Sequence, residues 1–201
     1  MSDTGHRKFP GHLAVGLALR VNHQERVEAL IIGVLSKGAG ESELKIKIPG
    51  GCADSEMENA EPGLALGREL SSEVGGGDGF MICVGPQYFV RAKTPRGGGH
   101  VHYQYFYLVE VHGPLREVDR IEDEGDETLS PPMWVPIELL LPKGAMEIFF
   151  SHREPLIRGF AIFAHERPQI AAQYAEVLAD YDTGVFEPWF NPQHFRQRRA
   201  A

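Results

Sequence analysis

The sequence predicts an α/β fold of the α+β type, in which a mixed β-sheet lies between helices. Three observations lead to this fold class. Apolar or alternating runs suited to strands fill much of the first two thirds of the chain, an amphipathic helix interrupts them between Pro62 and Gly75, and the final third is more helical. Strands and helices interleaved in this way are typical of a sheet packed between helical layers.

Three strands are predicted before the first helix. The apolar run Leu13–Val21 suits a strand and is followed by the turn residues Asn22-His23-Gln24. Periodicity alone leaves Val27–Leu35 open to helix or strand, but its β-branched centre and the glycines that follow favour a strand. Glu43–Ile48 alternates between apolar and polar residues, which indicates a half-buried strand leading into the turn Pro49-Gly50-Gly51.

A helix is expected to begin at Pro62, because the first helical position needs no N–H donor. Residues 52–61, which precede it, are acidic and read as a loop. The helix carries an apolar stripe that should face the core, made of Leu66, Leu70 and Val74. Glu69 and Glu73 lie to one side of this stripe, at the expected boundary between core and solvent. The run Gly75–Gly79 ends the helix.

After the helix, Phe80–Val90 contains strand material split by Gly85-Pro86. His100–Val111 is long and alternating, as expected of a central strand. Residues 116–130 are charged and poor in apolar groups, which predicts an exposed loop. Met133–Pro136 then leads into a short helix that runs to Leu141.

The final third predicts helices at Met146–Ile162, broken at Pro155, and at Pro168–Tyr181, before the aromatic and basic tail Phe186–Arg199. We expect a disordered N-terminus (1–10), one domain (11–145) and a helical C-terminal extension (146–201) packed on it. The extension could complete a helical layer, cover the sheet or form a homodimer contact.

Composition narrows the function classes. The chain of 201 residues has a net charge of −8 and a pI near 5.6, which argues against binding a nucleic-acid polymer through its backbone. Two cysteines, Cys52 and Cys83, cannot complete a tetrahedral zinc site. No apolar run approaches the roughly 18 residues of a membrane span. We therefore expect a soluble cytoplasmic protein.

Glu69 and Glu73 are the strongest candidates for chemistry. They lie one helical turn apart beside a glycine-rich turn. Two carboxylates there repel each other, but a shared divalent cation would stabilise both, since Mg²⁺ prefers oxygen ligands and bridges to phosphates. A Glu-x-x-x-Glu pattern is more often a solvated helix surface, so its context decides the interpretation.

That context resembles the Nudix hydrolase signature, G-x5-E-x7-R-E-U-x-E-E-x-G-U, where U is a bulky aliphatic residue. Arg68, Glu69, Leu70, Glu73 and Gly75 match its second half in register. The resemblance covers roughly residues 11–145. It implies a Nudix-like α/β/α sandwich and a hydrolase that cleaves nucleoside diphosphate derivatives with Mg²⁺ or Mn²⁺. It further implies that Glu69 and Glu73 are metal ligands, that Arg68 is the charge partner that orients them, and that Gly51 and Gly75 shape the adjoining loops.

The box of residues 51–75 also departs from this signature. Ser72 stands where the first glutamate of the pair is expected, and the loop between Gly51 and Arg68 is a few residues too long. The earlier glutamate falls on Ala60, with Glu58 and Glu61 beside it. These departures leave two main hypotheses: a metal-dependent hydrolase, or a catalytically impaired Nudix-fold module that binds a nucleotide or a protein partner. A further hypothesis is an assembly protein that dimerises through the last third of the chain.

Other polar groups are weaker candidates. His100 and His102 could share a cation but lack a third ligand at suitable spacing. The resemblance implies a further carboxylate from outside the box, and the sequence leaves Glu110 and the acidic run 119–127 open for that role. The sequence predicts neither the base nor the sugar of a substrate.

Overall fold

The computed structural model describes residues 11–37, 42–95, 101–122, 127–141, 144–146 and 148–179. The expected disordered N-terminus (1–10), the loop 96–100 with His100, and the tail 186–199 lie outside these residues. Among the helices that are described, none combines the length and the apolar character needed to cross a membrane.

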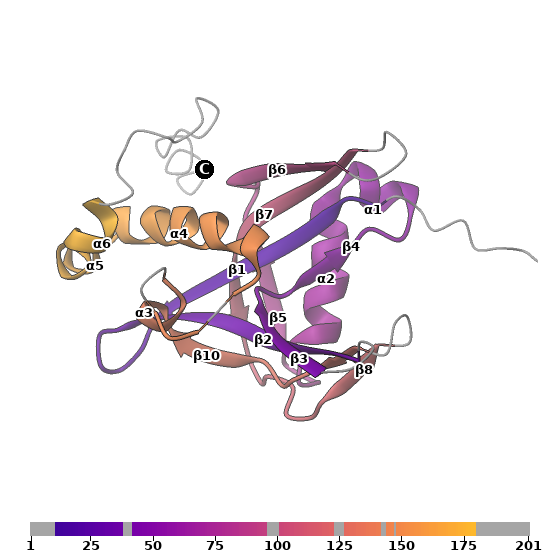
Figure 1. The fold of residues 1–201 in the computed structure, drawn as a ribbon, viewed down its shortest axis with the longest axis horizontal. Coiled ribbons are helices and arrows are strands. Elements are labelled where there is room, and N and C mark those ends of the chain that lie inside the picture. The colour runs from indigo at the N-terminus through magenta and orange to yellow at the C-terminus, as the bar shows by residue number, and fades with distance from the viewer. Residues whose placement is uncertain are drawn as a thin grey trace, which may run out of the picture.

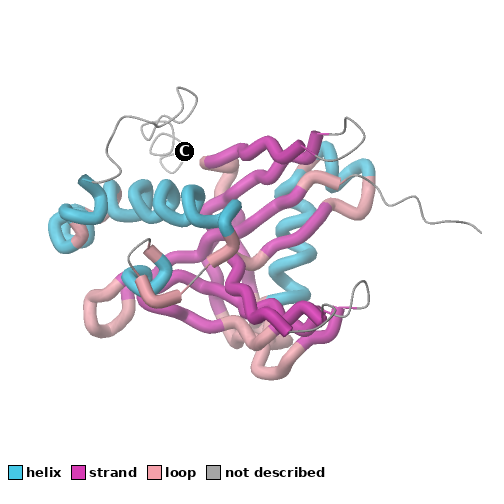
Figure 2. The backbone as a smooth tube through the Cα atoms, in the orientation of Figure 1, coloured by secondary structure: helices cyan, strands magenta, loops and turns pink. Residues whose placement is uncertain are grey.

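Within the described residues, ten strands form one mixed sheet, drawn as arrows in Figure 1 and as magenta tube in Figure 2. They are β1 (Leu13–Val21), β2 (Val27–Lys37), β3 (Ser42–Lys47), β4 (Gly50–Cys52), β5 (Met81–Val84), β6 (Val90–Pro95), β7 (Val101–His112), β8 (Arg120–Glu122), β9 (Glu127–Leu129) and β10 (Met133–Pro136). The main strand order is β5-β7-β1-β2-β9-β8. β1 pairs parallel with β7 but antiparallel with β2 and β4, so the sheet is mixed as predicted.

Helices cover both faces of the sheet. They are α1 (Glu56–Ala60), α2 (Pro62–Glu73), α3 (Ile137–Leu140), α4 (Phe150–His165), α5 (Pro168–Gln173) and α6 (Ala175–Ala179). Figure 1 shows α2 and α4 on opposite sides of β1. Successive strand residues point to opposite faces, so Ala18 packs in the cluster of Leu70 on α2, whereas its neighbour Leu17 packs in the cluster of Phe160 on α4. The architecture is an α/β/α sandwich, as the sequence predicts.

The strands that were predicted from their pattern of apolar residues form at the predicted positions. β1, β2, β3 and β7 agree with the predicted runs to within a few residues, and β2 resolves its ambiguity as a strand. β10 and α3 occupy the predicted strand and short helix. α2 begins at Pro62, and the predicted stripe of Leu66, Leu70 and Val74 is fully buried.

Two predicted loops contain regular structure. Within residues 52–61 the helix α1 forms, and the Ser55 side chain accepts a hydrogen bond from the Glu58 N–H at its first turn. Within residues 116–130, β8 and β9 form a hairpin whose Leu129 is buried, because β9 pairs with β2. The loop predictions were wrong for these segments. α1 follows from a local helix-start pattern, whereas β8 and β9 are ordered by pairing with each other and with the distant strand β2.

The predicted helix boundaries in the final third also differ. α4 begins at Phe150 and continues through Pro155 without a break. A proline inside a helix destabilises it by about 3 kcal/mol. Burying one large apolar side chain stabilises the fold by about 1.5–3 kcal/mol, and both Leu156 and Phe160 are buried against the sheet, so their burial offsets the cost of Pro155. The following helix divides into α5 and α6 at Tyr174, whose ring packs edge-on against Phe160.

Candidate functional site

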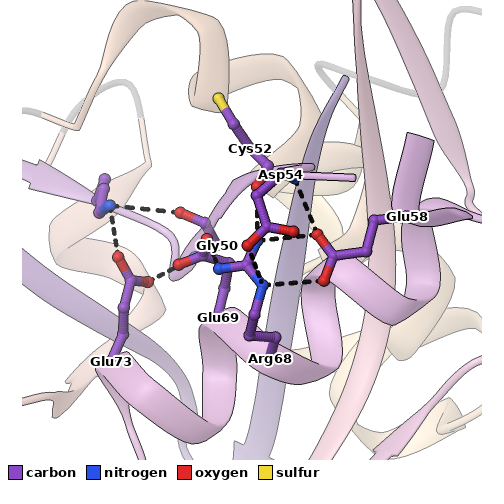
Figure 3. Close-up of polar contacts among 8 residues, drawn as sticks. Gly50, Cys52, Asp54, Glu58, Arg68, Glu69 and Glu73 are labelled. Atoms are coloured by element: carbon purple, nitrogen blue, oxygen red, sulfur yellow. Dashed lines mark hydrogen bonds and ion pairs between the residues drawn. The ribbon is translucent and has the colours of Figure 1, made fainter. Parts of the chain in front are cut away.

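The glutamate-bearing helix is held against the sheet by its apolar stripe. Leu66 and Leu70 are fully buried and pack with Ala14 and Ala18 of β1. With this face fixed, the adjoining side of α2 faces the loop that follows β3. Figure 3 shows the side chains of Arg68, Glu69 and Glu73 pointing from α2 towards that loop.

The glycine turn, Pro49-Gly50-Gly51, leads into β4 and lies close to β1 and α2 because its glycines lack side chains. Gly50 has a φ of 144°, which L residues rarely adopt, and a Cβ there would overlap the backbone of Ala14. A Cβ on Gly51 would overlap the carboxyl group of Glu69. The Pro-Gly-Gly sequence therefore lets backbone and glutamates share one small volume.

Glu73 is a buried carboxylate with a partner on each oxygen. Its side chain is 1% exposed, its Oε1 lies 2.7 Å from the Nζ of Lys47, and its Oε2 accepts the Gly50 N–H at 2.8 Å. Burial raises the pKa of Glu73 above its ordinary value, while the Lys47 ammonium opposes that rise and the nearby Glu69 charge adds to it. The sequence placed Glu73 at the boundary of the core, and this was wrong because the glycine turn and Lys47 close over it.

Arg68 joins the other acidic groups of the site. Its Nε and Nη2 donate to the two oxygens of Glu58, each at 2.9 Å, and its Nη1 donates to Glu69 Oε1 at 2.7 Å. Nη2 also donates to the Cys52 carbonyl at 2.8 Å, which fixes the guanidinium against β4. Arg68 therefore pairs with Glu69, whereas the counter-charge of Glu73 is Lys47 and not Arg68.

Glu58 is the acidic residue before the helix that the sequence left unassigned. The Arg68 hydrogen bonds lower the pKa of Glu58 to about 2, and the Asp54 N–H donates to the same carboxylate at 3.0 Å. A signal for it exists in the sequence. Ser55-Glu56-Met57-Glu58 has the Ser-x-x-Glu pattern of a helix start, which would have predicted α1 and placed Glu58 in its first turn.

The remaining candidates do not join this site. Glu110 follows Phe106 and Leu108 along β7 at even spacing, so it lies on the α4 face of the sheet, opposite α2. Asp119 and Glu127 adjoin the β8–β9 hairpin at the far edge of the strand order. Asp123, Glu124 and the side chain of His102 lie outside the described residues.

The donor chemistry of the site suits a cation. Ser72 is half-buried beside Glu73 and supplies no carboxylate, and the described residues contain no group of three His, Cys, Asp or Glu side chains arranged around a metal position. A cation is nevertheless held here, because the Lys47 ammonium lies 2.7 Å from Glu73 Oε1 and 3.3 Å from the Gly50 carbonyl oxygen. Carboxylate and carbonyl oxygens are also the ligands that Mg²⁺ and Mn²⁺ prefer.

Comparisons with known proteins place the fold. No protein-family model and no curated protein matches the sequence. Among solved structures, RenU, a Nudix hydrolase from M. smegmatis, is similar with a TM-score of 0.53 and 14% identity, over 78% of this chain and 87% of that one. A NUDIX hydrolase from Nitrosomonas europaea has a TM-score of 0.49 and 17% identity, over 74% and 86% of the two chains. An Ap4A hydrolase from C. elegans has a TM-score of 0.36 and 11% identity, over 84% and 98%.

The similarity to RenU covers 78% of this chain, and at 14% identity it defines the fold. The glutamates and arginine of α2 lie where the sequence resembles the Nudix signature. The chain therefore has the fold of the Nudix hydrolases, an α/β/α sandwich with a mixed sheet.

Proposed function

We propose that the protein hydrolyses a diphosphate linkage in a nucleoside diphosphate derivative, with Mg²⁺ or Mn²⁺ held by Glu69 and Glu73. The observation that carries this proposal is the convergence of two carboxylates and a carbonyl on one glycine turn, where the Lys47 ammonium already contacts Glu73 and the Gly50 carbonyl. Such an oxygen cluster binds positive charge, and a phosphoric anhydride reaches an acidic site only together with cations.

Each residue of the site has a distinct task. Glu73, buried and held by the Gly50 N–H, is the rigid ligand. Glu69 is held by Arg68 and keeps its side chain 14% exposed, so water reaches it more readily than Glu73. Glu69 is therefore the box carboxylate best placed to accept a proton from the attacking water. The bound divalent ion would polarise a phosphoryl oxygen and lower the pKa of that water.

A purified-protein screen tests this function. With Mg²⁺ or Mn²⁺, the wild type is expected to hydrolyse at least one nucleotide sugar, dinucleotide polyphosphate or nucleoside triphosphate. Glu73→Gln and Glu69→Gln are each expected to lower kcat/KM by about a hundredfold or more. Glu61→Gln is the matched control, because Glu61 is an exposed glutamate just before α2. Glu69→Gln and Glu73→Gln variants that fold and retain wild-type rates would remove both residues from the mechanism.

The second candidate is a binding module that has lost catalysis. Ser72 in place of a carboxylate and the ion pair of Lys47 with Glu73 favour it, because both reduce the charge available to a metal. In that case nucleotides would raise the melting temperature without metal-dependent turnover. Turnover of any member of the screen that is lost in Glu73→Gln would exclude this candidate.

A further inference from the structure

Lys47 is the cation that pairs with Glu73 in the candidate metal site. It is the last residue of β3 and precedes Gly50 by three positions in the sequence. Its side chain is 14% exposed. Its ammonium contacts Glu73 Oε1 at 2.7 Å and the Gly50 carbonyl at 3.3 Å. The other Glu73 oxygen accepts the Gly50 N–H. The oxygen of Glu73 that is free of the backbone is thus the one that Lys47 holds.

A divalent ion and this ammonium cannot occupy the position together. Two cations within a few ångströms repel each other strongly where solvent is scarce, and Glu73 is 1% exposed. A metal bound through Glu73 Oε1 must therefore displace the ammonium. Lysine can make that exchange, since its charge is carried on a flexible four-carbon stem.

We infer that Lys47 is an internal competitor of the metal, which holds the cation position until a divalent ion displaces it. This inference rests on the proposed function only in taking Glu73 as a metal ligand. Both box glutamates are then neutralised by the chain itself, Glu73 by Lys47 and Glu69 by Arg68. Removing Lys47 restores one negative charge to a buried oxygen cluster and should strengthen metal binding.

Titration of Mn²⁺ into the full chain by calorimetry tests the competition. If the ammonium leaves its position in about one molecule in ten, the apparent affinity for Mn²⁺ is lowered about tenfold. Lys47→Met should therefore bind Mn²⁺ about tenfold or more tightly than the wild type. Lys45→Met removes the same charge from an exposed position on the same strand and should leave the affinity unchanged. The double variant Lys47→Met with Glu73→Gln should lose the gain.

Thermal melting gives a second readout. Without metal, Lys47→Met leaves Glu73 buried without a counter-charge and should melt below the wild type, and Mn²⁺ should raise its melting temperature more than that of the wild type. If Lys47→Met does not fold, Lys47→Gln keeps a donor to Glu73 without the charge and is titrated instead. Mn²⁺ affinity equal to or weaker than wild type in the folded variant would overturn the inference. A gain in affinity in a protein that hydrolyses no substrate would support the inference and refute only the hydrolase.

Discussion

The ion pair between Glu58 and Arg68 makes the most direct test of how α1 and α2 are joined. Arg68 donates to both oxygens of Glu58, and the Glu58 side chain is 13% exposed. The pKa of Glu58 is lowered from 4.5 to about 2, chiefly by these hydrogen bonds. This difference sets an upper bound of about 3 kcal/mol on the stabilisation. Because the Arg68 side chain is 39% exposed, solvent screening reduces the expected value to about 1–2 kcal/mol.

Glu58→Gln should therefore lower the free energy of unfolding by about 1–2 kcal/mol at pH 7, measured by urea denaturation. The folded pKa is depressed, so the stabilisation is complete above pH 4.5 and is lost as the pH falls towards 2. The difference between wild type and variant should shrink by roughly half at pH 3. Glu56→Gln, an exposed position in the same helix, is the control. A variant as stable as wild type at pH 7, or a difference that does not shrink in acid, would refute this reasoning.

Two glycines of the box should respond to alanine in opposite ways. Gly51→Ala places a methyl group on the Glu69 carboxyl, so it should disturb Glu69 and reduce metal-dependent activity, as measured by the rate of diphosphate hydrolysis. Wild-type activity in that variant would show that the close approach is dispensable. Gly67→Ala meets open space inside α2 and should raise the free energy of unfolding by about 0.5–1 kcal/mol in urea denaturation, with activity unchanged. A loss of stability there would mean that α2 is packed differently.

Local sequence patterns predicted most of the sheet and the central helix. Alternation or continuous apolar character identified β1, β2, β3 and β7, since side-chain burial in a strand follows a period of two. Pro62 and the stripe containing Leu70 fixed the start and the buried face of α2. The pattern that resembles the Nudix signature singled out Arg68 and Glu69, whose side chains are hydrogen-bonded in the structure. These features depend on neighbours in sequence, so the sequence alone carries them.

Segments that depend on distant contacts were mispredicted for the opposite reason. β8 and β9 lie in a charged stretch and are ordered by pairing with each other and with β2. α4 runs through Pro155 because its apolar face is buried on the sheet. The stabilisation from that burial cannot be read from the sequence around Pro155. In both cases a tertiary contact outweighs the local preference.

The properties of the candidate site likewise depend partly on local sequence and partly on tertiary contacts. The amino-acid sequence determined that Glu69 and Glu73 share one side of a helix next to a glycine turn, because residues four apart on a helix are neighbours. Only the tertiary structure decided that Glu73 is buried and that Lys47, on a strand earlier in the chain, supplies its counter-charge. Burial and ion pairing depend on which surfaces the fold brings into contact, and no local pattern encodes that contact.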